Sequence, residues 1–354
     1  MSILDIARPE LRALQPYQAA AQVVETVRLN ANEAPSSNAT DPFRRKLNRY
    51  PQVRPEGIRA ALAARFACAP EQLLVTRGSS EAIDLLIRGF CRAGIDNVVT
   101  TAPTFSMYRH YAEIQNSELR EVPTDPNDDF NVDAGALLRA CDDNTRIVFV
   151  CTPNNPTGTT VPRSQITELL QQLRGRALVV VDEAYIEFAD TPSTSELLDQ
   201  FENLVVLRTL SKALAFAGAR CGAVLAATDA IGLLNAIQAP YALATPVVEC
   251  VEDALQEQYL EVAAADVQKI AAERQRLSQA LREYAIVEKT WPSSANFVLV
   301  RVKDVDRIRS ACEQHKVLLR YLGGTLSDCI RITIGTPDEN NLLLQILSEL
   351  EGAD

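Results

Sequence analysis

The stretch Ala177-Leu-Val-Val-Val-Asp182 decides the fold, because it is a short apolar run that ends directly in a carboxylate. A run of this length without polar alternation is typical of a strand that is buried on both faces of a parallel sheet. Similar apolar runs occur before and after it along the chain: Leu73–Thr76, Val98–Thr101, Ile147–Cys151, Leu204–Thr209 and Cys221–Ala226. We therefore expect a mostly parallel central sheet.

Segments with helical spacing separate these runs, namely Glu81–Cys91, Arg163–Leu173 and Thr194–Phe201. The alternation predicts an α/β fold in which helices sandwich the sheet. Beyond Tyr241 the pattern changes and predicts a smaller α+β domain, with these elements: a helical region over Pro246–Tyr284, strands at Ala295–Val300, Val317–Leu319 and Ile330–Ile334, and a closing helix at Glu339–Leu350. We expect an N-terminal arm over residues 1–30, a large α/β domain over 31–243 and a small α+β domain over 244–354.

Composition narrows the class of protein. The 354 residues are 47% hydrophobic with a formal net charge of −11, which argues against nucleic acid or an anionic membrane as partner. No apolar run approaches the roughly 20 residues of a membrane span, and charged residues interrupt the N-terminal segment, so we expect a cytoplasmic protein. Two histidines give little basis for a metal site or a Ser-His-Asp triad. The eight cysteines contain no CxxC pair and are interpreted as reduced, buried thiols.

The segment Thr209-Leu-Ser-Lys212 sets a lysine beside hydroxyl groups, and Arg220 follows eight residues later. Lys212 is the only lysine between Lys46 and Lys269, although lysine and arginine together number 35. A lysine that forms a covalent link to an aldehyde cofactor, next to groups that bind the phosphate of that cofactor, needs this local chemistry. The alternative is a lysine that caps a surface turn.

Polar residues follow other predicted strands at their carboxyl ends, where ligands gather in parallel sheets. Asp182 could keep a pyridine nitrogen protonated, and Tyr185 and Asn155 could bind the phenolic oxygen of the same ring. Gly78, Ser79 and Ser80 open a predicted helix and offer backbone N–H groups to a phosphate. The alternatives are ordinary helix caps and turn residues.

Three further side chains complete this set. Phe105 follows the strand Val98–Thr101 and could stack on a flat ring, although core packing would also explain it. Arg331 lies within an apolar strand, where an unpaired charge is costly and requires a carboxylate or phosphate partner. A structural salt bridge is the alternative. Arg320 is a weaker case of the same kind.

Seven sequence blocks in this order resemble the fold-type I pyridoxal-phosphate aminotransferases of the aspartate aminotransferase superfamily, and within it the histidinol-phosphate aminotransferase branch. The blocks extend over essentially the whole chain. They are Leu29-Asn-Ala-Asn-Glu33, Asn48-Arg-Tyr-Pro51, the segment from Arg77 to Leu86, Pro153-Asn-Asn-Pro-Thr-Gly158, Val181-Asp-Glu-Ala-Tyr-Ile-Glu-Phe188, Arg208-Thr-Leu-Ser-Lys212 and the segment from Leu319 to Thr336.

The resemblance implies a role for each matching residue. Lys212 would carry pyridoxal 5'-phosphate and move a proton, with Asp182 and Tyr185 as the other catalytic residues. The implied cofactor-binding residues are Gly78, Ser79, Ser80, Phe105, Asn155, Asp182, Tyr185, Thr209, Ser211, Lys212, Arg220 and Tyr50. The implied substrate-binding residues are Tyr17, Asn32, Arg320 and Arg331. Phe105 departs from the tyrosine of many family members, so stacking is retained and a hydroxyl contact is not.

The implied reaction is amino transfer between L-histidinol phosphate and 2-oxoglutarate, which gives imidazole-acetol phosphate and glutamate in histidine biosynthesis. Tyr50 would reach the phosphate in the site of a second subunit, so the resemblance implies a homodimer with shared active sites. Its partners would be a small-molecule amino donor and a 2-oxo acid acceptor, without metal, nucleic acid or membrane. Two functions on the same fold stay open: an aromatic or other amino-acid aminotransferase, and a threonine-phosphate decarboxylase. A dehydrogenase or a non-catalytic α/β binding protein is the rival from another class.

Overall fold

A seven-stranded sheet forms the centre of the protein in a computed structural model that describes residues 3–22, 27–37 and 45–352. The strand order is β1-β7-β6-β5-β4-β2-β3, and only β7 runs antiparallel to its neighbours among the described strands. The predicted mostly parallel sheet is therefore confirmed. The strands are β1 (Leu73–Thr76), β2 (Asn97–Ala102), β3 (Glu118–Pro123), β4 (Thr145–Cys151), β5 (Leu178–Asp182), β6 (Leu204–Thr209) and β7 (Gly222–Ala226).

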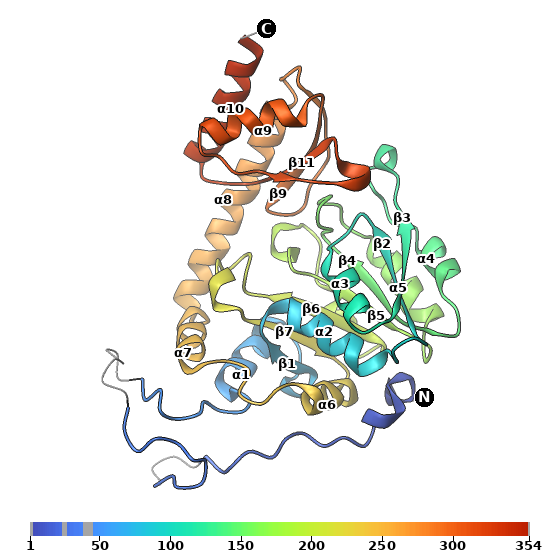
Figure 1. The fold of residues 1–354 in the computed structure, drawn as a ribbon, viewed down its shortest axis with the longest axis vertical. Coiled ribbons are helices and arrows are strands. Elements are labelled where there is room, and N and C mark those ends of the chain that lie inside the picture. The colour runs from blue at the N-terminus through green and yellow to red at the C-terminus, as the bar shows by residue number, and fades with distance from the viewer. Residues whose placement is uncertain (1–2, 23–26, 38–44, 353–354) are drawn as a thin grey trace.

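Helices cover both faces of this sheet (Figure 1). Because side chains alternate along a strand, Val179 and Val181 of β5 enter one apolar cluster, while Leu178 and Val180 enter the other. The first cluster is completed by α1 (Glu56–Arg65), α4 (Ala134–Ala140), α5 (Arg163–Gln172) and α7 (Thr245–Ala254). The second is completed by α2 (Gly78–Phe90), α3 (Met107–Ile114) and α6 (Thr228–Ile237). This double burial explains why the strands are continuously apolar.

A second, antiparallel sheet lies at the other end of the long helix α8 (Glu257–Leu281) (Figure 1). Its order is β10-β11-β9-β8, and it packs with α8, α9 and α10 around a separate apolar core. The elements are β8 (Val287–Thr290), β9 (Phe297–Val302), α9 (Val305–Gln314), β10 (Arg320–Tyr321), β11 (Cys329–Thr333) and α10 (Pro337–Gly352).

Direct hydrogen bonds join this smaller unit to the loops of the central sheet. The indole Nε1 of Trp291 donates to the carbonyl of Pro126 at 3.0 Å. The backbone N–H of Ser294 donates to the carbonyl of Gly158 at 2.8 Å. These bonds hold the second sheet over the carboxyl-terminal edge of the first.

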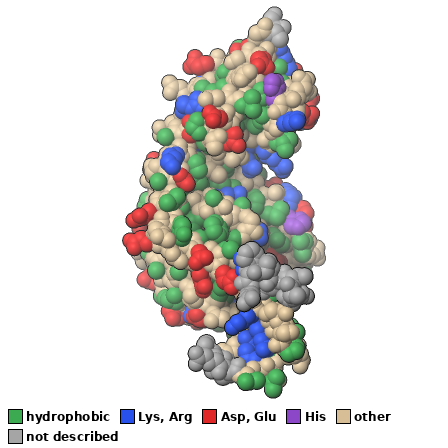
Figure 2. Space-filling model, turned by 90° about the vertical axis from the view of Figure 1, so that its left-hand side faces the viewer, with side chains coloured by type: hydrophobic (Ala, Val, Ile, Leu, Met, Phe, Trp, Pro, Cys, Tyr) green, Lys and Arg blue, Asp and Glu red, His purple; other side chains and the backbone are tan. Residues whose placement is uncertain are grey.

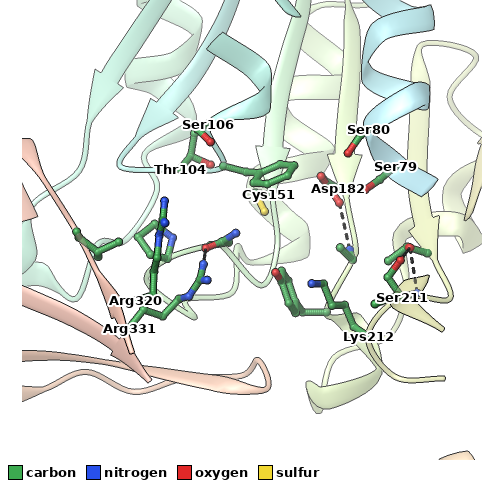
Figure 3. A pocket seen from close by; sticks show the side chains of 18 of the residues that line it. Ser79, Ser80, Thr104, Ser106, Cys151, Asp182, Ser211, Lys212, Arg320 and Arg331 are labelled. Atoms are coloured by element: carbon green, nitrogen blue, oxygen red, sulfur yellow. Dashed lines mark hydrogen bonds between the residues drawn. The ribbon is translucent and has the colours of Figure 1, made fainter. Parts of the chain in front are cut away.

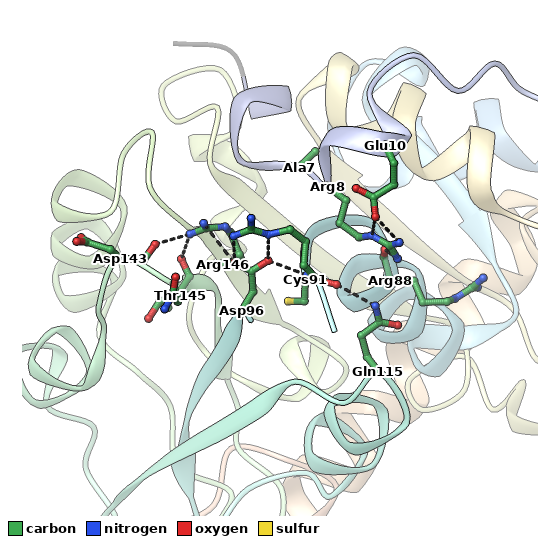
Figure 4. Close-up of polar contacts among 12 residues, drawn as sticks. Ala7, Arg8, Glu10, Arg88, Cys91, Asp96, Gln115, Asp143, Thr145 and Arg146 are labelled. Carbon is green, nitrogen blue, oxygen red and sulfur yellow. Dashed lines mark hydrogen bonds and ion pairs between the residues drawn. The ribbon is translucent and has the colours of Figure 1, made fainter. Parts of the chain in front are cut away.

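The start of the N-terminal segment packs against the helices of the central sheet, and the residues after it extend away from them. Residues of the short 3-10 helix Ile3–Ile6 are buried against α2 and α6, and Arg8 donates hydrogen bonds to the carbonyls of Arg88 and Gly89 (Figure 4). The N-terminal arm that follows this helix extends along the outside of the molecule and has exposed apolar side chains (Figures 1 and 2). Leu29 is 91% exposed. Among the residues that the structure describes, none covers this apolar side chain.

A buried carboxylate fastens the turn between α2 and β2. The Asp96 side chain is fully buried and pairs with Arg92 at 2.8 Å and with Arg146 at 3.3 Å (Figure 4). Burial alone would raise the pKa of Asp96, but the hydrogen bonds from Arg92 and the charge of Arg146 outweigh it and lower the pKa. The fold therefore neutralises this structural carboxylate with arginine.

The structure differs from the sequence prediction in three of the predicted segments, and it also contains the strand β3, which was not predicted. The predicted helix Thr194–Phe201 is a single 3-10 turn, Thr194–Leu197, because Ser193 and Thr194 hydrogen-bond to the buried Glu183 instead of continuing a helix. The helical region Pro246–Tyr284 is divided into α7 and α8. The strand predicted at Val317–Leu319 is displaced to β10. No helix in the described ranges combines the length and apolarity of a membrane span.

Candidate active site

The carboxyl ends of the parallel strands bring the predicted site residues to one edge of the sheet. β4 ends at Cys151, β5 at Asp182 and β6 at Thr209. β7 is antiparallel, so it begins at this same edge, and Arg220 lies just before it. This is why a residue that precedes a strand joins residues that follow other strands.

These strand ends enclose a cavity of about 460 Å³ between the two sheets (Figure 3). Most of the side chains predicted for the site line it: Ser79, Ser80, Phe105, Asn155, Asp182, Tyr185, Thr209, Ser211, Lys212, Arg220, Arg320 and Arg331. Three described residues from the same prediction, Tyr17, Asn32 and Tyr50, lie outside this lining. Gly78 contributes through the backbone, as the next paragraph describes.

One end of the cavity is a cradle for an anion. Gly78 has φ +73°, a backbone conformation that favours glycine, and a Cβ there would lie 2.8 Å from Nη2 of Arg220, so glycine also leaves room for the guanidinium beside the start of α2. Nη1 of Arg220 donates to Oγ of Ser211 at 3.4 Å, and Oγ1 of Thr209 donates to the same oxygen at 3.0 Å. Together with Ser79 at the N-terminus of α2, this donor set fits a phosphate group.

Asp182 lies in the middle of the cavity lining and is 1% exposed. Its Oδ2 accepts a hydrogen bond from the Tyr108 hydroxyl at 2.9 Å, and its Oδ1 accepts one from the backbone N–H of Ala184 at 3.2 Å. Burial raises the pKa of Asp182 to about 6, although both hydrogen bonds oppose the shift. None of the described ion pairs joins Asp182 to an arginine, in contrast to the buried Asp96 and Glu183. The Asp182 carboxylate is therefore free to pair with a cation that enters the cavity.

Lys212 follows β6 in a loop and projects into the cavity from the side opposite Ser106 and Thr104 (Figure 3). Its Nζ lies 5.7 Å from the centre of the Tyr185 ring. Burial lowers the pKa of Lys212, and the charges of Arg331 and Arg220 lower it further, against the opposing effect of Asp182. The Lys212 side chain remains exposed to the open cavity, so the shift reflects partial loss of hydration together with the nearby arginine charges, and a neutral amine, able to act as nucleophile or base, is more accessible than for a lysine in bulk solvent.

The other end of the cavity is also positively charged. Arg331 of β11 and Arg320 of β10 are cross-strand partners, and both enter the cavity from the smaller unit (Figure 3). Arg331 donates through Nη1 to Oδ1 of Asn155, whereas its buried Nε has no hydrogen-bond partner among the described residues. A guanidinium with an unsatisfied buried N–H is suited to bind an anionic ligand.

Aromatic rings form the remaining walls. Tyr185 is 7% exposed and packs edge-on against Phe297 of the smaller unit, with ring centres 5.2 Å apart. Phe105 is half-buried and contacts Tyr108 edge-on at 5.8 Å. Burial raises the pKa of Tyr185, so its hydroxyl stays protonated and is available as a donor.

The three predicted residues outside the cavity lie on or near the arm. Tyr50 is 50% exposed and stacks on Tyr241 with ring centres 4.6 Å apart. Tyr17 is 58% exposed. Asn32 has φ 55° and precedes Glu33, whose buried carboxylate pairs with Arg28 and Arg49. These three side chains therefore do not line the cavity described above.

Several lining residues escaped the sequence analysis. Ser106 and Cys151 line the cavity, and Tyr108 binds Asp182 from behind it. Tyr108 was not assigned to the site from the sequence. A usable signal exists, because Tyr108 lies in the first turn of α3, only three residues after the cavity-lining Phe105.

Replacement of Asp182 by asparagine tests the buried carboxylate. The pKa of Asp182 is raised to about 6 by burial, above the ordinary value near 4. Because the folded protein binds this proton more tightly than the unfolded chain does, the wild type has its full stability below about pH 4. It loses stability as the pH rises through the pKa of Asp182 in the folded protein. Above that value we expect Asp182→Asn to increase the free energy of unfolding of the ligand-free protein by roughly 2–3 kcal/mol. Urea unfolding as a function of pH measures this.

The matched control is Asp143→Asn, at a fully exposed carboxylate, which we expect to change the free energy of unfolding little at any pH. The difference between wild type and Asp182→Asn should vanish in acid. An Asp182→Asn protein that is no more stable than wild type at alkaline pH would contradict the proposed burial cost.

Comparison with known proteins agrees with this geometry. Residues 16–347 match the family model for aminotransferase class I and II. A histidinol-phosphate aminotransferase of Xanthomonas euvesicatoria pv. vesicatoria (strain 85-10) is 44% identical, and the alignment covers 99% of this chain and 98% of that protein. The crystal structure of histidinol-phosphate aminotransferase from Clostridium acetobutylicum has a TM-score of 0.78 at 20% identity, over 87% of this chain and 92% of that one, and shows the fold alone.

A third comparison bears on the cavity. The histidinol-phosphate aminotransferase from Sinorhizobium meliloti, solved in complex with pyridoxal-5'-phosphate, has a TM-score of 0.77 at 26% identity and covers 85% of this chain and 84% of that one. The full-length match and the fold thus lead to the same assignment. The chain belongs to the class I and II aminotransferase family, and its full-length relatives group it with the histidinol-phosphate aminotransferases.

Proposed function

We propose that this protein is a pyridoxal 5'-phosphate-dependent aminotransferase that transfers an amino group between L-histidinol phosphate and 2-oxoglutarate, as a step in histidine biosynthesis in the cytoplasm. One observation carries the proposal: the cavity has an anion-binding group at each end, with Lys212 and Asp182 between them (Figure 3). A phosphorylated cofactor and an anionic substrate need this arrangement.

The residues present fit pyridoxal 5'-phosphate. Its phosphate matches the cradle formed by the Gly78 turn, Ser211 and Arg220. A flat ring matches the wall provided by Phe105, and a protonated ring nitrogen matches the buried Asp182 carboxylate, whose charge otherwise lacks compensation. The assignment of these roles to individual residues is part of the proposal.

When bound, pyridoxal 5'-phosphate supplies an aldehyde that accepts the amino group and a ring that withdraws electrons. Lys212 holds the cofactor and, as a free amine with a lowered pKa, moves the proton at the substrate carbon that carries the amino group. Asp182 keeps the proton on the ring nitrogen by its negative charge. Tyr185 and Asn155 donate hydrogen bonds to the phenolic oxygen and orient the ring.

Arg331 and Arg320 bind the substrate anion at the opposite end. Both guanidiniums are fixed on adjacent strands, and either a phosphate or a carboxylate can accept their parallel N–H groups. The same pair therefore serves L-histidinol phosphate in one half-reaction and glutamate in the other. The bond from Arg331 to Asn155 links the substrate anion to the residue that orients the ring.

Half-reaction spectroscopy tests the function. Protein loaded with pyridoxal 5'-phosphate should convert to the amino form of the cofactor faster with L-histidinol phosphate than with phenylalanine, and O-phosphothreonine should release no carbon dioxide. Lys212→Ala should slow conversion by at least about 10³-fold, because a positioned base is lost. Lys269→Ala, at an exposed lysine of α8, is the matched control and should behave as wild type.

Borohydride treatment should attach the cofactor to the peptide that contains Lys212. A preference for phenylalanine would support an aromatic aminotransferase, and carbon dioxide release would support the decarboxylase. Protein that binds no pyridoxal 5'-phosphate would contradict the proposed function as a whole.

We also infer that the active unit is a homodimer with shared sites. Exposed apolar side chains on the arm, including Leu29 and Val27, support a second copy as the covering partner. Tyr50 is half-exposed and lies outside the cavity of its own protomer. We therefore assign Tyr50, with Tyr17 and Asn32, to the cavity of the second copy, where the Tyr50 hydroxyl would reach the cofactor phosphate.

Mixed dimers test this arrangement. Lys212→Ala and Tyr50→Ala protomers are each expected to be impaired, but random mixing should restore about a quarter of wild-type activity, because half of the dimers contain one intact site. A mixture of Lys212→Ala with Asp182→Ala should restore none, since both residues belong to the cavity of one protomer. A monomer in sedimentation, or mixed dimers without recovery, would contradict shared sites.

A further inference from the structure

Tyr108 lies directly behind the carboxylate at the centre of the site. Along β5, Asp182 shares the sheet face of Leu178 and Val180, which is the face covered by α3. Tyr108 is on α3, and its hydroxyl donates to Oδ2 of Asp182 at 2.9 Å. Helix and strand are thus joined at the carboxylate that lines the cavity.

Packing leaves the Tyr108 ring little freedom to move. The side chain is 0% exposed and stacks on Phe149 of β4, with ring centres 4.5 Å apart and an angle of 7° between the planes. Phe105, which lines the cavity, contacts the same ring edge-on. A rigid aromatic cluster therefore fixes the position of the Tyr108 hydroxyl next to Asp182. The cluster includes Phe105, the residue proposed to stack on the cofactor ring.

The surroundings of Asp182 make this hydroxyl important. Its carboxylate has two donors from the described residues, the Tyr108 hydroxyl and the backbone N–H of Ala184. Glu183 raises its proton affinity, Lys212 lowers it, and the uncharged Cys151 thiol lies beside the Tyr108 hydroxyl. A buried carboxylate that loses one of two donors loses both its fixed orientation and much of its preference for the charged form.

We propose that Tyr108 is a positioning residue that holds the Asp182 carboxylate ionised and aimed at the ring nitrogen of the cofactor. This inference rests on the proposed function, because it assigns a role toward pyridoxal 5'-phosphate. Tyr108 itself does not touch the substrate or the reacting atoms. It acts through Asp182. The Tyr108 ring also keeps Phe105 in place beside the cofactor ring.

Tyr108→Phe isolates the hydroxyl, because the ring and its stacking are retained. Loss of a hydrogen bond to a charged group should weaken pyridoxal 5'-phosphate binding by about tenfold, measured by titrating cofactor-free protein and following Trp291 fluorescence or absorbance. In the loaded enzyme kcat should fall by about the same factor. The KM for L-histidinol phosphate should stay within twofold, because Arg331 and Arg320 are untouched.

Tyr284→Phe is the matched control. Its hydroxyl donates to the carbonyl of Leu344 at 2.9 Å and lies 3.0 Å from Oγ of Ser348, beside the core of the smaller unit, so a tyrosine hydroxyl is removed far from the cavity. It should lower thermal stability and leave cofactor affinity, kcat and KM unchanged. If Tyr108→Phe reduces only stability, as this control does, the role is structural and the proposal is wrong.

A double-mutant cycle keeps the test decisive if Tyr108→Phe folds poorly. In an Asp182→Asn background the additional Tyr108→Phe change should alter cofactor affinity less than twofold, because the group through which Tyr108 acts is already neutral. Independent, additive effects would overturn the proposal. Wild-type protein that does not bind pyridoxal 5'-phosphate would overturn the proposed function and this inference together, whereas normal binding by both wild type and Tyr108→Phe would overturn the inference alone.

Discussion

The active site depends on one buried carboxylate, Asp182, for which the described chain supplies no cation at ion-pair distance. Elsewhere the fold pairs its buried acids with arginine: Asp96 with Arg92 and Arg146, and Glu183 with Arg208. Asp182 instead has two neutral donors and a pKa that burial raises to about 6. Such a site is costly to fold, and a protonated ring nitrogen is the charge that would offset the cost. We regard this difference between structural and functional carboxylates as the physical basis of the site.

The topology of the sheet places the other site residues next to the Asp182 carboxylate. The parallel strands deliver Asp182 and Thr209 to one edge, and the reversed direction of β7 brings Arg220 to the same edge. The second sheet then closes the opposite end with Arg331, whose bond to Asn155 crosses between the two units. The cavity therefore requires both units, and neither sheet by itself contains the two anion-binding ends.

Much of this architecture could be predicted from the sequence, because strands that are buried on both faces of the sheet have continuous apolar sequences. The strand β3 was missed for the opposite reason: it is a partly exposed strand at the edge of the sheet and carries Glu118, Arg120 and Glu121. The side chains at strand ends could be proposed, since each follows a recognisable run. Contacts between distant segments could not, and the bond from Tyr108 to Asp182 spans 74 positions. Arm residues such as Tyr50 were implied only by family resemblance, because the role proposed for them depends on a second chain.

The most direct test of the central claim is nitrogen NMR of the protein loaded with pyridoxal 5'-phosphate that carries ¹⁵N in the ring. Above the pKa of about 6 for Asp182, the ionised carboxylate should keep the ring nitrogen protonated in wild type and lose that hold in Asp182→Asn. We therefore predict a protonated chemical shift for wild type and an unprotonated one for the variant. The same unprotonated shift in both proteins would contradict the account.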